Sequence, residues 1–146
     1  MNKKEAIKRL DSLENEAKEL RKIIEKEEEI DVFKVKTYSE VCKHLKEQEL
    51  TSCDFSGEDG KKLLNFSKIK QLERFYNQGW KANWNNSNEY KYYPYFTKSS
   101  GGWSVGSGYY CFSDGHFYGG VGFYKTSEIA TFVGKTYKDI YTGLLD

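Results

Sequence analysis

Apolar residues near the start of the chain recur at alternating steps of four and three, from Ala6 to Ile24. This spacing places them along one narrow stripe of an α-helix, as in the seam of a coiled coil. The a positions of the heptad are Leu10, Ala17 and Ile24, and the d positions are Ala6, Leu13 and Leu20. The sequence therefore predicts an oligomerisation helix over residues 1–30, followed by a separate domain over residues 37–146.

Charged residues beside this seam favour parallel chains. The g positions hold Arg9 and Glu16, and the e positions hold Glu14 and Arg21. In parallel chains, Arg9 meets Glu14 of a neighbour, and Glu16 meets Arg21, so both pairs attract each other. The six residues from Arg9 to Glu14 also resemble a short arginine-to-glutamate trimer signature of small parallel coiled coils. We expect a homo-oligomer, either a dimer or a trimer.

The seam is short, because Glu27 and Asp31 occupy core positions after fewer than three heptads. A coiled coil of this length needs support from the rest of the protein. The alternative is an amphipathic helix that folds onto its own domain, although such a helix usually has a wider apolar face.

Helical signals continue after the first 30 residues. Thr37 and Glu40 have the spacing of a capping box, which predicts a helix from 38 to about 47. A second helix is expected from about 61 to 78, and Gly79 stands where a left-handed C-terminal cap would fall.

Residues 80–124 hold 15 of the 24 aromatic residues and most of the glycines, a composition typical of β-structure. Strands are expected over 89–97, 103–112 and 116–124. Pro94 restricts the first of them to a sheet edge or a bulge, because proline cannot donate to the ladder. The expected fold class is α+β, with helices packed on a three-stranded antiparallel meander.

A turn centred on Asp114 and Gly115 would fix the register of the last two strands and separate their faces. The expected core face carries Tyr110, Phe112, Phe117, Val121 and Phe123. The other face carries Trp103, Val105, Tyr109, Cys111, Tyr118 and Tyr124. A last helix, which Thr126 caps, should cover the core face. The other face is either a second core layer or a recognition platform.

The candidate partner-binding residues are all aromatic. They are Trp80, Trp84, Trp103, Tyr109, Tyr118 and Tyr124. In the asparagine-rich loop 80–88, the two tryptophans can stack on a base or a sugar while amides bond its edges. Tryptophans that pin a long loop to the core are an equally good explanation.

Catalytic and metal chemistry are not expected. The conceivable zinc ligands are Cys42, His44, Cys111 and His116. However, residues 42 and 44 project to different sides of a helix. Cys111 and His116 are the most specific nucleophile pair, but Asp114 is better explained by the turn, and no oxyanion hole is recognisable. We therefore expect no enzymatic activity, no metal and no cofactor.

The charge balance and the cysteine content limit which partners and which cellular location are expected. Basic residues number 23 and acidic residues 22, so no net field attracts a nucleic acid or an anionic membrane. No arginine follows Arg74. Residues 1–30 are too charged for a signal peptide, and no apolar run is long enough to span a bilayer. The odd number of cysteines argues for reduced thiols and a cytoplasmic location.

A set of stretches in the second part of the chain is specific when taken together. These are residues 79–84, 90–96, 121–128 and 134–141. With them the chain resembles a family of small bacteriophage and prophage proteins, in which a coiled-coil leader can precede the aromatic domain. The resemblance covers about residues 37–145. It implies a phage context but no established activity, so no catalytic residues are transferred.

Taken together, these features predict a phage accessory protein that binds stoichiometrically as an oligomer. Its partner would be a host protein or a small signalling ligand, so that it acts as an inhibitor of a host defence protein or as a sponge for its signal molecule. One alternative is a minor structural or assembly protein of the phage particle. Another is a single-stranded nucleic-acid-binding module.

Overall fold

The computed structural model describes residues 2–27, 30–57, 59–110 and 122–144, and its fold class is α+β. The chain divides into two compact units, Met1–Asp31 and Val32–Asp146. Within the described residues, no helix combines the length and the apolarity that a membrane crossing requires.

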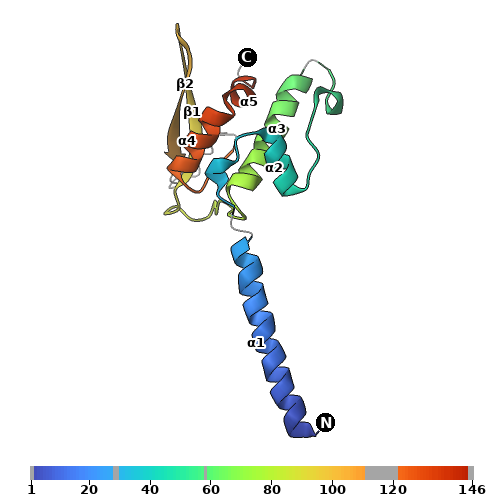
Figure 1. Cartoon of the computed structure of the whole chain (residues 1–146). Helices are drawn as coiled ribbons and strands as arrows, with labels where there is room; N and C mark the ends of the chain where they lie inside the picture. Colours follow the sequence, from blue (N-terminus) through green and yellow to red (C-terminus); the bar gives the residue numbers. More distant parts are fainter. Residues whose placement is uncertain (1, 28–29, 58, 111–121, 145–146) are drawn as a thin grey trace. The chain divides into compact units, whose positions relative to one another are not determined.

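The first unit is the helix α1 (Lys3–Glu27) (Figure 1). Its N-terminus is closed by a reciprocal pair of hydrogen bonds. The main-chain N–H of Glu5 donates to Oδ1 of Asn2 at 2.9 Å, and the N–H of Asn2 donates to Oε2 of Glu5 at 3.0 Å. Two of the amide groups that a helix start leaves unsatisfied are therefore paired.

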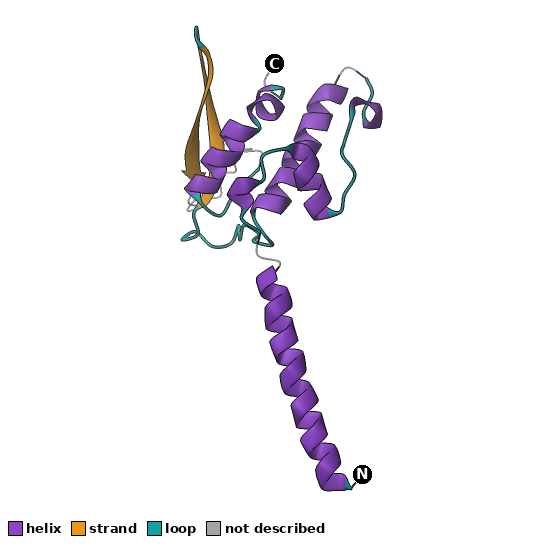
Figure 2. Ribbon diagram, in the orientation of Figure 1, coloured by secondary structure: helices purple, strands orange, loops and turns teal. Residues whose placement is uncertain are grey.

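In chain order, the second unit has helices, then one β-hairpin, and then further helices (Figure 2). Its elements are the 3₁₀-helix η1 (Val32–Lys34), α2 (Tyr38–Leu45), the 3₁₀-helix η2 (Ser52–Asp54), α3 (Gly60–Tyr76), β1 (Lys91–Ser99), β2 (Gly102–Tyr110), α4 (Ser127–Thr136) and α5 (Lys138–Thr142).

The helix starts follow the local sequence signals. The N–H of Glu40 donates to Oγ1 of Thr37 at 3.3 Å, and Oε2 of Glu40 accepts the N–H of Thr37 at 3.1 Å, so the predicted capping box is confirmed. At the start of α4, the N–H of Ile129 donates to Oγ1 of Thr126 at 3.2 Å, as expected for a capping threonine. After α3, Gly79 has a φ of 85°, in the left-handed region that suits glycine.

The strands β1 and β2 form an antiparallel hairpin whose register runs from Lys91 opposite Tyr110 to Ser99 opposite Gly102. The turn therefore falls between the expected strands 89–97 and 103–112. Tyr92 uses its N–H and C=O on the edge away from β2, and alternation along the strand puts Pro94 on that same edge. The missing proline N–H thus removes no bond to β2, as expected for an edge position.

The predicted meander requires a correction at Tyr124. The N–H of Tyr124 donates to the oxygen of Tyr92 at 2.7 Å, and the N–H of Tyr92 returns a bond at 3.0 Å. Among the described residues, the segment 122–124 therefore lies beside β1, not beside β2, and the sheet has two strands. The reason is an anchor on α3: Glu73 accepts the N–H of Phe123 at 3.2 Å, and the side-chain amide of Asn77 donates to the Phe123 oxygen at 2.7 Å. The expected strand over 116–121 and the turn at Asp114 and Gly115 lie outside the described residues.

The side of the hairpin that α4 covers also differs from the expectation. A Cβ at Gly134 of α4 would lie 2.7 Å from Cβ of Pro94 and 2.8 Å from Cγ1 of Val105. The helix therefore packs on the face that carries Val105 and Trp103, which the sequence pattern assigned as the non-core face. On the opposite face, β2 offers Gly106 and Gly108, and the ring of Tyr93 lies across Gly108. Among the side chains of β2 that the structure describes, this face carries Ser104 and glycines, which give a helix little apolar surface to pack against.

The last predicted helix is interrupted. Tyr137 separates α4 from α5 with φ −113° and ψ 31°, outside helical values. The break lets the Tyr137 ring reach Tyr76 of α3, at 5.9 Å between centroids, while Tyr141 of α5 stacks on Phe96 of β1 at 5.2 Å.

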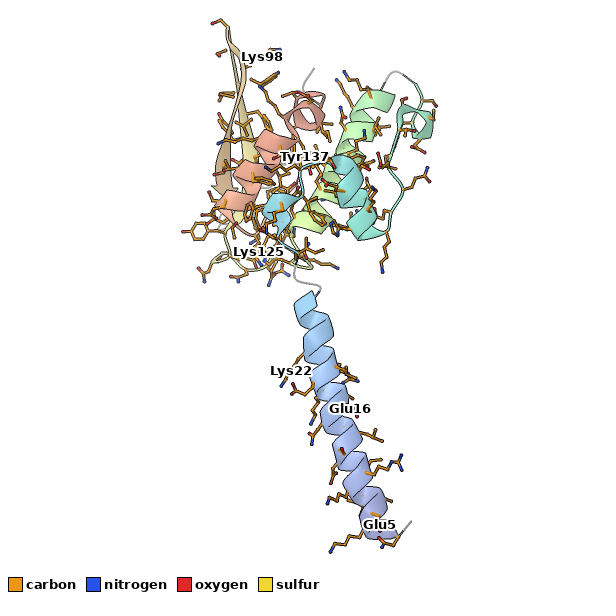
Figure 3. The ribbon with its side chains drawn as sticks, viewed as in Figure 1. Glu5, Glu16, Lys22, Lys98, Lys125 and Tyr137 are labelled. Atoms are coloured by element: carbon orange, nitrogen blue, oxygen red, sulfur yellow. The ribbon has the colours of Figure 1, made fainter. Side chains whose placement is uncertain are left out.

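The core of the second unit gathers around α3. Its most deeply buried apolar residues are Val41, Ile69, Leu72, Phe75, Tyr76, Tyr124, Ala130 and Val133. Figure 3 labels Tyr137, which lies among the side chains of this core. The hydroxyl of Tyr76 is 2.6 Å from the main-chain oxygen of Val35, so the segment that precedes α2 is fixed to α3 as well.

Candidate functional site

The heptad stripe of α1 is an exposed apolar surface. Leu10, Leu13 and Leu20 are exposed at 60%, 55% and 53%. Ala17 is also exposed and Ala6 is half-buried, whereas the side chain of Ile24 lies outside the described part. Three large apolar side chains in line on one helix are an unusual surface for a chain that stays alone. The stripe is therefore the first candidate for a functional contact.

The polar side of α1 carries ordinary helix-surface chemistry. Nζ of Lys22 lies 2.8 Å from Oε1 of Glu19, a pair three residues apart on the helix, and both side chains are well exposed. In the heptad these residues occupy the outer c and f positions, away from the seam. Figure 3 shows Glu16 and Lys22 projecting from this helix.

The second candidate, the loop between α3 and β1, is built around a lysine. Lys91 is completely buried, and its ammonium group donates to the main-chain oxygens of Asn86 at 3.1 Å and Glu89 at 2.8 Å. Oε1 of Glu89 is a third acceptor at 3.2 Å. The ring of Trp84 lies 5.6 Å from the same nitrogen, within the range of a cation–π contact. Burying an ammonium group is costly, and these partners offset that cost.

Glu89 ties the start of the loop to its end. Its Oε1 accepts the N–H of Asn83 at 2.7 Å. This hydrogen bond, together with smaller contributions from Lys91 and Trp80, lowers the pKa of the Glu89 carboxyl below its ordinary value. Two tight turns complete the loop: Oδ1 of Asn83 accepts the N–H of Asn85, and Oδ1 of Asn86 accepts the N–H of Asn88, each at 3.0 Å. The side-chain oxygens of Asn83 and Asn86, two of the asparagines considered for ligand contacts, are therefore used within the loop.

The two loop tryptophans are mostly explained by this arrangement. The ring of Trp84 packs edge-on against Phe123 at 4.9 Å between centroids, and 39% of the residue stays exposed. Trp80 is half-buried, and its side chain bonds to Glu89. Pinning the loop to the core, the second of the two readings of this segment, accounts for these contacts.

The proposed aromatic platform on the sheet is not assembled as expected. Tyr124 is completely buried, and its hydroxyl lies 2.7 Å from that of Tyr141. Burial raises the pKa of both hydroxyls. Tyr124 therefore belongs to the core. Its ring is fully enclosed and its hydroxyl bonds to Tyr141 of α5, so it cannot touch a partner. Trp103 is half-buried, and Nζ of Lys98 lies 5.0 Å from its ring. The side chain of Tyr109 and all of Tyr118 lie outside the described residues.

Residues with reactive side chains do not converge in the described part of the chain. Cys42 is buried, and burial raises the pKa of its thiol, whereas His44 is exposed and stacks on Phe75 at 5.4 Å. Cys53 is an exposed free thiol on η2. No group of three or more histidine, cysteine, aspartate or glutamate side chains is placed to hold a metal among these residues. Cys111 and His116 lie outside them.

Sequence reasoning missed the polar residues that hold the loop and the 122–125 segment. Asn77 is buried, and besides its bond to Phe123 its Oδ1 accepts the N–H of Lys125 at 3.1 Å. An asparagine that follows a helix is usually interpreted as a helix cap. No local sequence signal therefore shows that Asn77 holds the 122–125 segment. For Lys91 a weak signal existed, because Glu89 two positions earlier projects to the same side of an extended chain.

Comparison with known proteins gave no match: no protein-family model, no curated protein and no solved structure matches the sequence.

Proposed function

We propose that this chain is a non-enzymatic binding protein that self-associates through α1 and so presents several copies of its α+β unit to a partner. The observation that supports this most directly is the exposed leucine stripe, Leu10, Leu13 and Leu20, on a helix that forms a compact unit by itself.

The energetics make association through this stripe reasonable. Full burial of one leucine side chain is worth roughly 1.5–3 kcal/mol, and each chain offers three. Association costs about 4–15 kcal/mol in lost translational and rotational freedom. Two chains bury six of these side chains, roughly 9–18 kcal/mol, and micromolar assembly needs a surplus of about 8 kcal/mol over the association cost. The favourable part of these ranges supplies that surplus, so we propose assembly at micromolar concentration, in a geometry that the attractive charge pairs select.

An oligomer of this kind repeats one binding surface and gains avidity, which suits stoichiometric sequestration. The resemblance to phage proteins makes a host defence protein, or its small signalling ligand, the partner that we propose. A minor structural or assembly role in the phage particle is the alternative, and mass spectrometry of purified particles distinguishes the two.

The test is the mass of the full-length protein in solution. Light scattering at micromolar concentration should give a multiple of the 17.0 kDa chain mass. The double change Leu13→Asp and Leu20→Asp should give single chains, with the near-ultraviolet circular dichroism of the aromatic-rich unit unchanged. Ser12→Asp, at an exposed position off the seam, introduces the same residue and should leave the mass unchanged. A wild-type protein that is monomeric at these concentrations would overturn the proposal.

A further inference from the structure

We infer that α1 joins three parallel chains, not two, an inference that rests on the self-association proposed above. The first observation is that the apolar surface is wider than the seam at the N-terminal end of α1. Ile7, at an e position, is 53% exposed beside Ala6 and Leu10. In a two-stranded coil an e position lies at the wet rim. A third helix draws the e and g positions toward the seam and shields such a side chain.

The seam carries only part of the pattern that selects two chains, because Leu13 and Leu20 occupy d positions but the a positions are mostly not β-branched. Two-stranded parallel coils favour β-branched residues at a with leucine at d. Here the a positions are Leu10, Ala17 and Ile24, so only the last is β-branched. Between Ala6 and Ile24 no polar residue occupies an a or d position, although a buried asparagine is a common device for fixing a dimer. The core residues of the seam therefore do not restrict the assembly to two chains.

The charged residues next to the seam then favour three chains. Arg9 and Glu14 flank the core residues Leu10 and Leu13, so the aliphatic stem of Arg9 can lie over the seam while its guanidinium meets the Glu14 carboxylate of the next chain. In a ring of three parallel helices this contact occurs at every interface, and it covers the apolar edge that a third helix creates.

The same charges oppose antiparallel helices. If two antiparallel helices overlap along the whole seam, Glu14 comes to face Glu14 of the neighbour, and Glu16 faces Glu16. Like charges at these positions repel each other. The parallel arrangement brings the N-termini together, so a residue near the start of α1 reports on the orientation.

Sedimentation equilibrium of the full chain tests the number of chains. We expect a particle of three times 17.0 kDa. Arg9→Glu turns each attraction into a repulsion and should raise the concentration for half-assembly on the order of tenfold, since exposed ion pairs are individually weak but are repeated at each interface. Adding Glu14→Arg to that variant should restore the wild-type value. Lys8→Glu, the same kind of charge reversal at an outer f position, should have little effect.

The outcomes separate this inference from the proposed function. A stable particle of two or four chains overturns the trimer and leaves self-association intact, whereas single chains remove both. Orientation is tested with Asn2→Cys under mild oxidation, and the wild type, whose Cys53 is exposed, provides the background. Rapid cross-linking above that background supports parallel chains, and cross-linking no faster than background overturns the parallel arrangement.

Discussion

The ammonium group of Lys91 lies 3.2 Å from the carboxylate of Glu89 and 2.8 Å from the main-chain oxygen of the same residue. The two residues stand two positions apart, one at the end of the loop and one at the start of β1. Because Glu89 also accepts the N–H of Asn83, the pair closes the loop on itself. This geometry makes the asparagine-rich loop a fixed part of the unit, in which the ring of Trp84 lies 5.6 Å from the lysine nitrogen.

Replacement of Lys91 by methionine should therefore destabilise the second unit. The change keeps most of the side-chain volume but leaves the oxygens of Asn86 and Glu89 without their donor. Loss of one partner of a buried, hydrogen-bonded pair costs roughly 3–5 kcal/mol when both are fully buried. Glu89 keeps 25% of its side chain exposed, so about 2–3 kcal/mol is expected. Urea unfolding measures this change, and amide exchange at Asn83 should accelerate. Lys81→Met, at an exposed lysine of the same loop, should be nearly neutral.

Glu89 should contribute to the loss of stability in acid. Its pKa is lowered in the folded chain from an ordinary value of 4.5, mainly by the Asn83 N–H. The unfolded chain therefore binds a proton at a higher pH than the folded chain, and stability falls as the pH drops from near 4.5 toward the folded pKa. In Glu89→Gln this component is absent, so the free energy of unfolding should fall less steeply between about pH 5 and pH 3. Equal slopes for the variant and the wild type would contradict the assignment. Glu128→Gln, at an exposed glutamate, is the control.

Local features of the fold were predictable from the sequence because they depend on neighbours a few residues apart. The capping box of Thr37 and Glu40 and the cap at Thr126 involve residues three positions apart. The edge position of Pro94 follows from its missing N–H. In each case a short-range hydrogen bond, or its absence, decides the conformation, and no distant segment has to be known.

Features set by distant segments were not predictable in this way. Alternation along β2 separates Val105 from Gly106, but only the approach of Gly134 decides which face becomes the core. Tyr124 pairs with Tyr92 because Glu73 and Asn77, about 50 residues earlier in the chain, hold the segment beside it. The same distinction holds for the candidate site. The apolar stripe of α1 was predictable from the heptad spacing of its residues, whereas the burial of Tyr124 depends on distant segments and was not.

Gly134 should tolerate no side chain. Alanine improves helix propensity by up to about 1 kcal/mol, but its Cβ would lie 2.7 Å from Cβ of Pro94 and 2.8 Å from Val105. Both neighbours are short and stiff, so α4 would have to move off the hairpin. Overpacking of this kind costs about 1–3 kcal/mol, and we expect a net loss of stability on thermal or urea unfolding. The pair Lys135→Gly and Lys135→Ala, at the exposed next position of α4, measures the glycine-to-alanine propensity difference alone. A stabilised Gly134→Ala variant would show that α4 does not pack this closely.

Replacing Tyr76 or Tyr137 by phenylalanine should reduce the free energy of unfolding by unequal amounts. The Tyr76 hydroxyl lies 2.6 Å from the Val35 carbonyl, which can only accept, so Tyr76 donates to it and accepts from Tyr137 at 2.8 Å. Tyr137→Phe removes one donor and should cost about 1 kcal/mol, the net value of a typical hydrogen bond. Tyr76→Phe leaves both the Val35 oxygen and the Tyr137 hydroxyl without their partner in a buried site, so about 2–3 kcal/mol is expected. Urea unfolding of both single variants and the double variant measures these costs. Because the Tyr137 hydroxyl is already unsatisfied in Tyr76→Phe, adding Tyr137→Phe should cost little more, and strictly additive costs would contradict the shared bond.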